Sequence, residues 1–167
     1  MNIRKFQGSD IHDIVSLFYG TVHTINTKDY TPDQLNAWAP LQEQQTREDL
    51  WLESLSRNIT YVAEINGETA GFADMTEAGH IDRMFTHKDY QGQGIASALL
   101  HVLESEAALL GLDLLDVDAS LTAKPFFEHH GFRTVTEQNV VRNGITLVNF
   151  KMIKALSSSG QNTLTNR

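Results

Sequence analysis

The chain has 167 residues, 41% hydrophobic and 20% charged, which suits one domain with a sizeable core and is marginal for two. Its formal net charge of -8 argues against a nucleic-acid partner, because non-specific nucleic-acid binding needs a basic surface. The absence of cysteine excludes a disulfide framework, a thiolate metal site and a cysteine nucleophile.

The start of the chain carries no targeting signal that we recognise. Residues 1–6 lack the long apolar core of a signal peptide. No run in the sequence approaches the roughly 20 apolar residues that cross a bilayer. We therefore expect no membrane partner and a cytoplasmic location, with which the absence of cysteine agrees.

The first part of the chain predicts a strand followed by helices. Residues 3–6 are predicted to form a short first strand. Helices are predicted over residues 10–24, 32–39 and 46–56. Thr31 is the expected cap of the second helix, Pro32 occupies its first position, and Pro40 ends it.

The rest of the chain predicts a mixed α/β domain. Residues 58–65 alternate as a half-buried strand does, and Asn66-Gly67 is a preferred hairpin turn, so residues 69–75 should pair antiparallel with them. The remaining elements are expected as strand 79–86, helix 95–110, strand 114–119, helix 122–130 and strands 135–141 and 146–153. We expect one domain over residues 1–156 and a disordered tail over residues 157–167, which is rich in Ser, Asn and Thr.

A glycine-rich turn precedes the long helix, in the sequence Gln91-Gly92-Gln93-Gly94-Ile95-Ala96. Such a turn leaves the first backbone N–H groups of the helix unpaired, and together with the helix dipole they favour a phosphate. A Cβ at either glycine would crowd a ligand on the turn. The expected phosphate donors are the amides of Gln93, Gly94, Ile95, Ala96 and Ser97. A plain loop that uses glycine only for turning is the alternative.

These motifs resemble the GCN5-related N-acetyltransferases, or GNATs. Gln91, Gly94 and Ala96 match the pattern Gln/Arg-x-x-Gly-x-Gly/Ala of that superfamily. Residues 126–132 (FFEHHGF) match its aromatic pair and Gly-Phe pair, except that Phe127 stands where many members have tyrosine. Residues 30–38, 81–82 and 119–128 further resemble a bacterial branch of acetyltransferases of unassigned substrate.

The resemblance implies a GNAT fold, an α+β domain in which helices flank a mixed, mostly antiparallel sheet of about seven strands, splayed between strands four and five. It implies an enzyme that transfers the acetyl group of acetyl-CoA directly to a primary amine of a small molecule or peptide, without a metal. A non-catalytic module that binds or senses acyl-CoA on the same fold is the alternative. The oligomeric state is expected to be a monomer or a homodimer.

The resemblance also implies which residues contact the cosubstrate. By this resemblance, the phosphate expected on the glycine-rich turn is the pyrophosphate of CoA. The backbone of Met84, Phe85 and Thr86 should run beside the pantetheine arm in the gap between the splayed strands. The remaining implied contacts are Gln91, Gly92, Ser120, Lys124 and Phe127. The alternatives are a helix cap for Ser120, a solvated side chain for Lys124 and core packing for Phe127.

Asp82 and His80 are the predicted catalytic residues, with Asp82 favoured because it lies deeper in its strand. They are two residues apart, so their side chains share one face. An amine must lose a proton before it attacks, and an imidazole titrates near neutral pH. Asp82 can alternatively bind a cationic amine, orient a water or pair with Arg83. Phe127 has no proton for the departing thiolate, so water or another residue must supply it.

The acceptor site is expected under the first two helices, which cover the cleft in this superfamily. His23, Tyr30 and Trp38 are the candidates there, because aromatic rings stack on flat or cationic groups. Core packing is the alternative for Trp38. The seven histidines form no HxxxH or HExxH pattern, so we expect no metal site.

Overall fold

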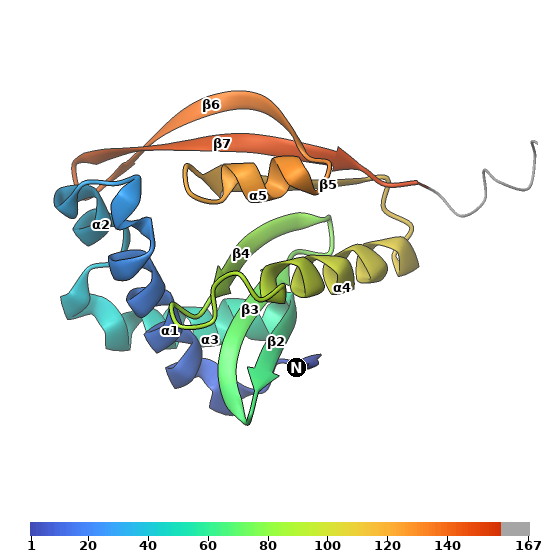
Figure 1. Cartoon of the computed structure of the whole chain (residues 1–167), viewed down its shortest axis with the longest axis horizontal. Helices are drawn as coiled ribbons and strands as arrows, with labels where there is room; N and C mark the ends of the chain where they lie inside the picture. Colours follow the sequence, from blue (N-terminus) through green and yellow to red (C-terminus); the bar gives the residue numbers. More distant parts are fainter. Residues whose placement is uncertain (158–167) are drawn as a thin grey trace, which may run out of the picture.

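The computed structural model describes residues 1–157, which form an α/β domain around one seven-stranded sheet (Figure 1). The elements are β1 (Asn2–Lys5), α1 (Ile11–Thr24), α2 (Pro32–Trp38), α3 (Gln44–Arg57), β2 (Ile59–Ile65), β3 (Glu68–Met75), β4 (His80–Thr86), α4 (Ile95–Leu109), β5 (Leu114–Ser120), α5 (Lys124–His129), β6 (Arg133–Arg142) and β7 (Ile145–Ala155). Apart from residue 157, the predicted tail lies outside the described residues.

The strands are ordered β1-β2-β3-β4-β5-β7-β6, and every neighbouring pair is antiparallel except β4 and β5. This confirms the predicted mixed, mostly antiparallel sheet flanked by helices. The hairpin predicted at Asn66-Gly67 joins β2 to β3, with positive φ angles of 52° and 76° at the two turn residues.

Local sequence signals explain most of the helix boundaries. The Thr31 hydroxyl accepts a hydrogen bond from the Gln34 amide at 3.2 Å, and the Gln34 side chain accepts one from the Thr31 amide at 2.9 Å. Asp10 precedes α1 as predicted, but its carboxylate makes no cap bond to that helix. It accepts two hydrogen bonds from Arg4 and one from the Gln7 amide, in the capping box of the 3-10 turn before α1. Helix α3 begins at Gln44, two residues before the predicted Thr46.

The two faces of the sheet bury separate cores. Helices α4 and α5 cover one face, where Leu99, Leu103 and Phe127 are buried. Helices α1 and α3 cover the other face, where Phe18 and Leu55 are buried. In Figure 1, α2 lies beside the far end of the β6–β7 hairpin, and the Gln34 side chain donates a hydrogen bond to the Thr146 carbonyl there. Both cores hold β4 in place, which positions the candidate site.

Strands β4 and β5 separate after a short contact. They pair in parallel at His80 with Asp116 and at Ile81 with Val117, after which β5 continues along β7 alone. A bulge lies in β4 at the same place, because Asp74 pairs with Arg83 while Met75 pairs with Ile81. This is the splay expected between strands four and five, and it leaves an open gap in the middle of the sheet.

Candidate functional site

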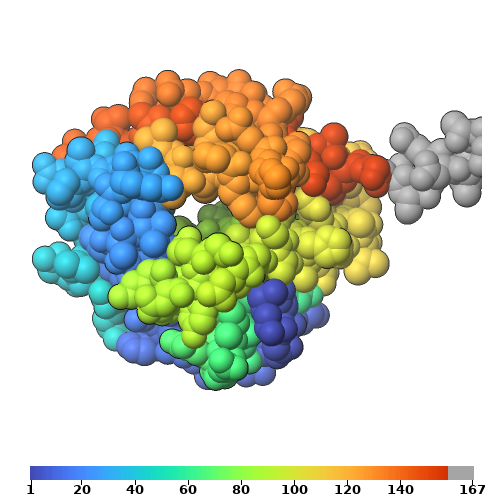
Figure 2. All heavy atoms as spheres, in the orientation of Figure 1, coloured from blue at the N-terminus to red at the C-terminus, as the bar shows by residue number. Residues whose placement is uncertain are grey.

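The gap between β4 and β5 opens into a cavity of about 1100 Å³. Its walls come from β4 and β5, from α2 and α3, and from the β6–β7 hairpin. Figure 2 shows a hollow in the same region, between the green segment at the start of α4 and the orange segment that carries α5. The cavity is therefore open toward the glycine-rich turn on one side and toward the first helices on the other.

His80 lies in the cavity wall among three carboxylates. Its Nδ1 is 2.7 Å from Asp116 Oδ2, and its Nε2 is 3.4 Å from Asp82 Oδ1 and 4.0 Å from Asp118 Oδ2. The two predicted catalytic side chains thus lie together, on the face that the strand pattern indicated. A carboxylate behind an imidazole fixes the ring and its tautomer, and this leaves Nε2 directed at Asp82.

Asp82 also has structural partners. The Asn58 side chain donates to Asp82 Oδ2 at 2.7 Å and to Asp74 Oδ2 at 2.9 Å, and the Arg83 guanidinium lies 3.9 Å from Asp82. Asp74 is fully buried and pairs with Arg83. Burial raises the pKa of Asp74, although the hydrogen bonds from Arg83 oppose this. The pairing of Asp82 with Arg83 is the predicted alternative, and it leaves Asp82 Oδ1 facing His80.

The glycine-rich turn presents its backbone to solvent. Gly92 and Gly94 have φ angles of 73° and 80°, and no heavy atom lies within 4 Å of a Cβ built at either one. Within the described chain, none of the N–H groups of residues 93–97 donates a hydrogen bond. The Gln91 side chain donates to the Thr86 carbonyl at 2.8 Å, which ties the turn to the end of β4. Unpaired amides at the start of a long helix are an arrangement that favours an anion.

Some backbone N–H and C=O groups of β4 face the gap and not β3. The His87 amide donates to the Ala70 carbonyl on β3, and in an antiparallel pair the residues alternate between facing the partner and facing away. By this alternation Met84 directs its N–H and C=O toward the gap, while Phe85 directs its own toward β3. The carbonyl of Thr86 is occupied, because Thr21 and Gln91 both donate to it.

The other side chains predicted for the cosubstrate differ in their surroundings. The Ser120 hydroxyl lines the cavity and accepts from the Ala123 amide at 3.1 Å, as a cap does. Lys124 lies 3.3 Å from Glu128. Phe127 is buried in the core and also lines the cavity. The Ser97 hydroxyl lies 3.0 Å from Nε2 of His130, which joins the start of α4 to α5.

The three predicted acceptor residues lie in three different settings. Trp38 lines the cavity and packs edge-on against Phe18. Tyr30 also lines the cavity, but its hydroxyl donates to the Val148 carbonyl at 2.9 Å and accepts from the Leu121 amide at 2.8 Å. His23 lies outside this cavity, with Nε2 2.7 Å from the Ala39 carbonyl.

Replacing Tyr30 with phenylalanine should lower the free energy of unfolding by about 1–3 kcal/mol, because it removes two part-buried hydrogen bonds, one with the Leu121 amide and one with the Val148 carbonyl. Burial raises the pKa of Tyr30, so the hydroxyl stays neutral and able to donate to Val148 at neutral pH. Urea unfolding of wild type and Tyr30→Phe measures the difference. Equal stability of the two proteins would show that the two hydrogen bonds of the Tyr30 hydroxyl do not contribute to stability.

Several residues of the cavity and of the contacts behind it were not predicted from the sequence. Arg47, Trp51, Asp118 and Arg142 line the cavity, while Asn58 and Asp116 bind the lining residues Asp82 and His80. The alternation of β5 contained a usable signal for two of them, because Asp116, Asp118 and Ser120 are two apart and share the face that turns away from the core. The others come from α3, from the end of α3 and from the distant hairpin, and no local pattern connects them with β4.

A match to known proteins decides the family. The profile described as an acetyltransferase (GNAT) domain matches residues 26–154. The chain belongs to the GNAT family. GNAT proteins of this family are acetyl-CoA-dependent N-acetyltransferases, so this chain is an acyltransferase, as predicted.

Individual GNAT relatives agree with this assignment. The chain is 37% identical over 153 residues to the uncharacterized N-acetyltransferase YafP of Escherichia coli strain K12, covering 91% of this chain and 94% of YafP. The crystal structure of a GCN5-related N-acetyltransferase from Rhodopseudomonas palustris is 30% identical, with a TM-score of 0.87 and coverage of 93% and 95%. YncA from Salmonella typhimurium, solved with acetyl-CoA, has the same fold at 21% identity, a TM-score of 0.69 and 95% coverage of each chain.

Two absences hold for residues 1–157 of this GNAT protein, one of metal ligands and one of membrane-spanning helices. Across residues 1–157, no group of three or more His, Asp or Glu side chains is arranged to hold a metal ion. None of the helices in that same stretch combines the length and apolar character needed to cross a bilayer.

Proposed function

We propose that this GNAT protein transfers the acetyl group of acetyl-CoA directly to a primary amine of a small molecule or a peptide. The observation that carries the proposal is the position of one cavity, which joins the gap between β4 and β5 to the side chains of His80, Asp82 and Asp118. A thioester in the gap and an amine beside the carboxylates would meet there.

The residues of the gap fit the shape and chemistry of CoA. The free amides of residues 93–97 suit the pyrophosphate, and the open space beside Gly92 and Gly94 lets it approach the backbone. Met84 offers the N–H and C=O that an extended pantetheine arm can pair with. We propose the Met84 N–H as the donor to the thioester oxygen, which leaves the Met84 C=O to accept from an amide of the arm.

For the acceptor half, we propose that Asp82 and Asp118 hold the amine and that His80 takes its proton. A carboxylate attracts the ammonium form, and Nε2 of His80 lies within reach of a group bound to Asp82. Asp116 steadies the imidazole from its Nδ1 side and stabilises the charge that it gains. His80 is thus the base in this proposal, and Asp82 is the residue that binds the amine and orients it.

Protonation of the departing thiolate falls to solvent in this proposal. Phe127, at the family tyrosine position, has no proton to give. Within the described residues Tyr30 is the tyrosine that lines the cavity, and its hydroxyl is bound on both sides. The cavity is open to water, which can supply the proton.

Replacing Gly94 with alanine should weaken CoA binding by about tenfold or more, because the added methyl group occupies the space over the turn. The same substitution at Gly111 is a matched control. That glycine follows the other end of α4, has φ of 72°, and has no neighbour within 4 Å of an added Cβ. Both variants bear the same backbone cost of about 1 kcal/mol, so calorimetric titration with CoA isolates the contribution of the ligand.

The wild-type titration tests the proposed function itself. Saturable binding of acetyl-CoA, with release of CoA thiol when an amine is added, is the expected result. Absence of binding at millimolar concentration would contradict the proposal. Binding without thiol release, across a broad amine panel, would favour the non-catalytic acyl-CoA module instead. Equal CoA affinity of the two alanine variants would show that the turn is not part of the CoA-binding site.

A further inference from the structure

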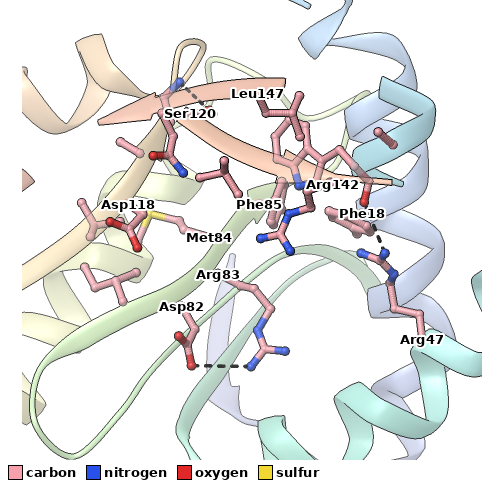
Figure 3. A pocket seen from close by; sticks show the side chains of 18 of the residues that line it. Phe18, Arg47, Asp82, Arg83, Met84, Phe85, Asp118, Ser120, Arg142 and Leu147 are labelled. Carbon is pink, nitrogen blue, oxygen red and sulfur yellow. Dashed lines mark hydrogen bonds and ion pairs between the residues drawn. The ribbon is translucent and has the colours of Figure 1, made fainter. Parts of the chain in front are cut away.

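Two arginines of the cavity have no acidic partner among residues 1–157. Arg47 comes from α3, and Arg142 ends β6 at the turn of the hairpin. Neither forms an ion pair with a described residue, whereas the third arginine of the cavity, Arg83, pairs with the buried Asp74. Figure 3 shows the guanidinium groups of Arg47 and Arg142 pointing into the cavity, close to one another in the view.

Arg47 is held in place by aromatic rings. Its guanidinium carbon lies 5.0 Å from the ring centroid of Phe18 and 5.6 Å from those of Tyr19 and Trp51. One of its nitrogens donates to the Trp38 carbonyl at 3.2 Å. A guanidinium carries five N–H donors in a planar fork, so most of them stay available. Arg47 is therefore a positioned cation and not a freely moving surface side chain.

The charges of the cavity are divided between two regions. Asp82 and Asp118 lie on the left of Figure 3, while Arg142 and Arg47 lie farther to the right. In Figure 3 the apolar side chains of Met84 and Phe85, which line the cavity, lie between these two regions. Glu43 also lines the cavity but pairs with neither arginine among the described residues. The cavity therefore has an acidic end, an apolar middle and a basic end.

The charge at the basic end of the cavity is opposite in sign to the net charge of the protein. The net charge of -8 repels anions at long range, so an anionic ligand needs cations placed locally. Two guanidinium groups that line one cavity repel each other, and an anion bound there relieves that repulsion. The fork of arginine matches the two oxygens of a carboxylate or a phosphate.

We propose that the acetyl acceptor is an amine that also carries an anionic group, a carboxylate or a phosphate. The amine would lie at Asp82 and Asp118, the anionic group between Arg47 and Arg142, and an apolar spacer along Phe85. The inference rests on the proposed function and makes its substrate class narrower. Binding at both ends holds the amine in one orientation toward the thioester.

Turnover of matched amines tests this substrate class. The panel contains amino carboxylates and amino phosphates of graded length, each beside a neutral amide or ester of the same skeleton. For one of the two anionic series, we expect kcat/KM to be about tenfold or more higher than for the neutral analogues. The difference should arise from a lower KM. Arg142→Gln should bring that ratio close to one. Arg133→Gln, an exposed arginine of the same strand outside the cavity, should leave the ratio unchanged.

A binding measurement tests the same point without catalysis. The chain has two tryptophans, and both Trp38 and Trp51 line the cavity, so tryptophan fluorescence reports its occupancy. With CoA bound, N-acetylated amino acids should bind about tenfold tighter than their neutral amides, and Arg142→Gln should abolish the difference. Equal binding of acid and amide, or a preference that survives in Arg142→Gln, would overturn the inference. Absence of thiol release with every amine would instead contradict the proposed function.

Discussion

Asp82→Asn is expected to lower kcat/KM for the amine by roughly 10–10²-fold, the loss of one hydrogen bond between charged groups. The substitution removes the charge that attracts the ammonium group and the acceptor next to His80 Nε2, 3.4 Å away. The side-chain oxygen of asparagine can still accept from Asn58, so the fold around the bulge should persist. The measurement is CoA thiol release at varied amine concentration and saturating acetyl-CoA, with the acceptor that the wild type uses best.

Two controls separate this effect from general damage. The CoA affinity of Asp82→Asn should equal that of wild type, because the glycine-rich turn is distant from Asp82 along β4. Asp113→Asn makes the same chemical change at an exposed residue outside the cavity, between α4 and β5, and should keep wild-type turnover. Unchanged turnover in Asp82→Asn would remove this carboxylate from the acceptor site and leave it a structural partner of Asn58 and Arg83.

Asp74→Ala is expected to lower the free energy of unfolding by about 3–5 kcal/mol. Asp74 is fully buried and Arg83 has a side-chain exposure of 12%, so removal of the carboxylate leaves a largely buried guanidinium whose one remaining ion pair among the described residues is the longer contact with Asp82, at 3.9 Å. A loss of this size corresponds to a fall in Tm of roughly 6–20 °C for a domain of this length. Urea unfolding, with the midpoint shifted at constant slope, is the measurement.

The double variant Asp74→Leu with Arg83→Met identifies the cause of that loss. Both charges are then absent, and well-packed apolar side chains can replace a buried ion pair at little cost. Arg83 already packs its guanidinium over the Trp51 ring at 5.0 Å, a place that a methionine side chain suits. Recovery of most of the stability would assign the loss to the unpaired charge, whereas a loss equal to that of Asp74→Ala would assign it to packing.

The sequence predicted the features that depend on neighbouring residues. The cap at Thr31, the hairpin at Asn66-Gly67 and the turn at Gly92 and Gly94 are local, because each backbone geometry is encoded within a few positions. The splay between strands four and five was also predicted, but it came from the family resemblance, since no local pattern reports where two distant strands part.

The features that failed to show in the sequence depend on contacts between distant segments. His80 pairs with Asp116 across 36 residues, and Tyr30 bonds Leu121 and Val148 across 91 and 118 residues. Tyr30 was predicted to contact the acceptor because an aromatic residue near the cleft suits stacking. Its ring does line the cavity, but its hydroxyl is bonded to the backbone of β7 and of the turn that follows β5.

Because β4 and β5 pair only briefly, the proposed binding of acetyl-CoA between them would link its concentration to the folding equilibrium. In the described residues, two parallel residue pairs join the strands before the gap to those after it. A pantetheine arm that pairs with both edges would complete the sheet as a strand does, and would bind the folded chain only. Such a ligand at a hundred times its Kd adds about 2.7 kcal/mol to the free energy of unfolding. The cellular concentration of acetyl-CoA would then affect the folded fraction of this protein as well as its turnover rate.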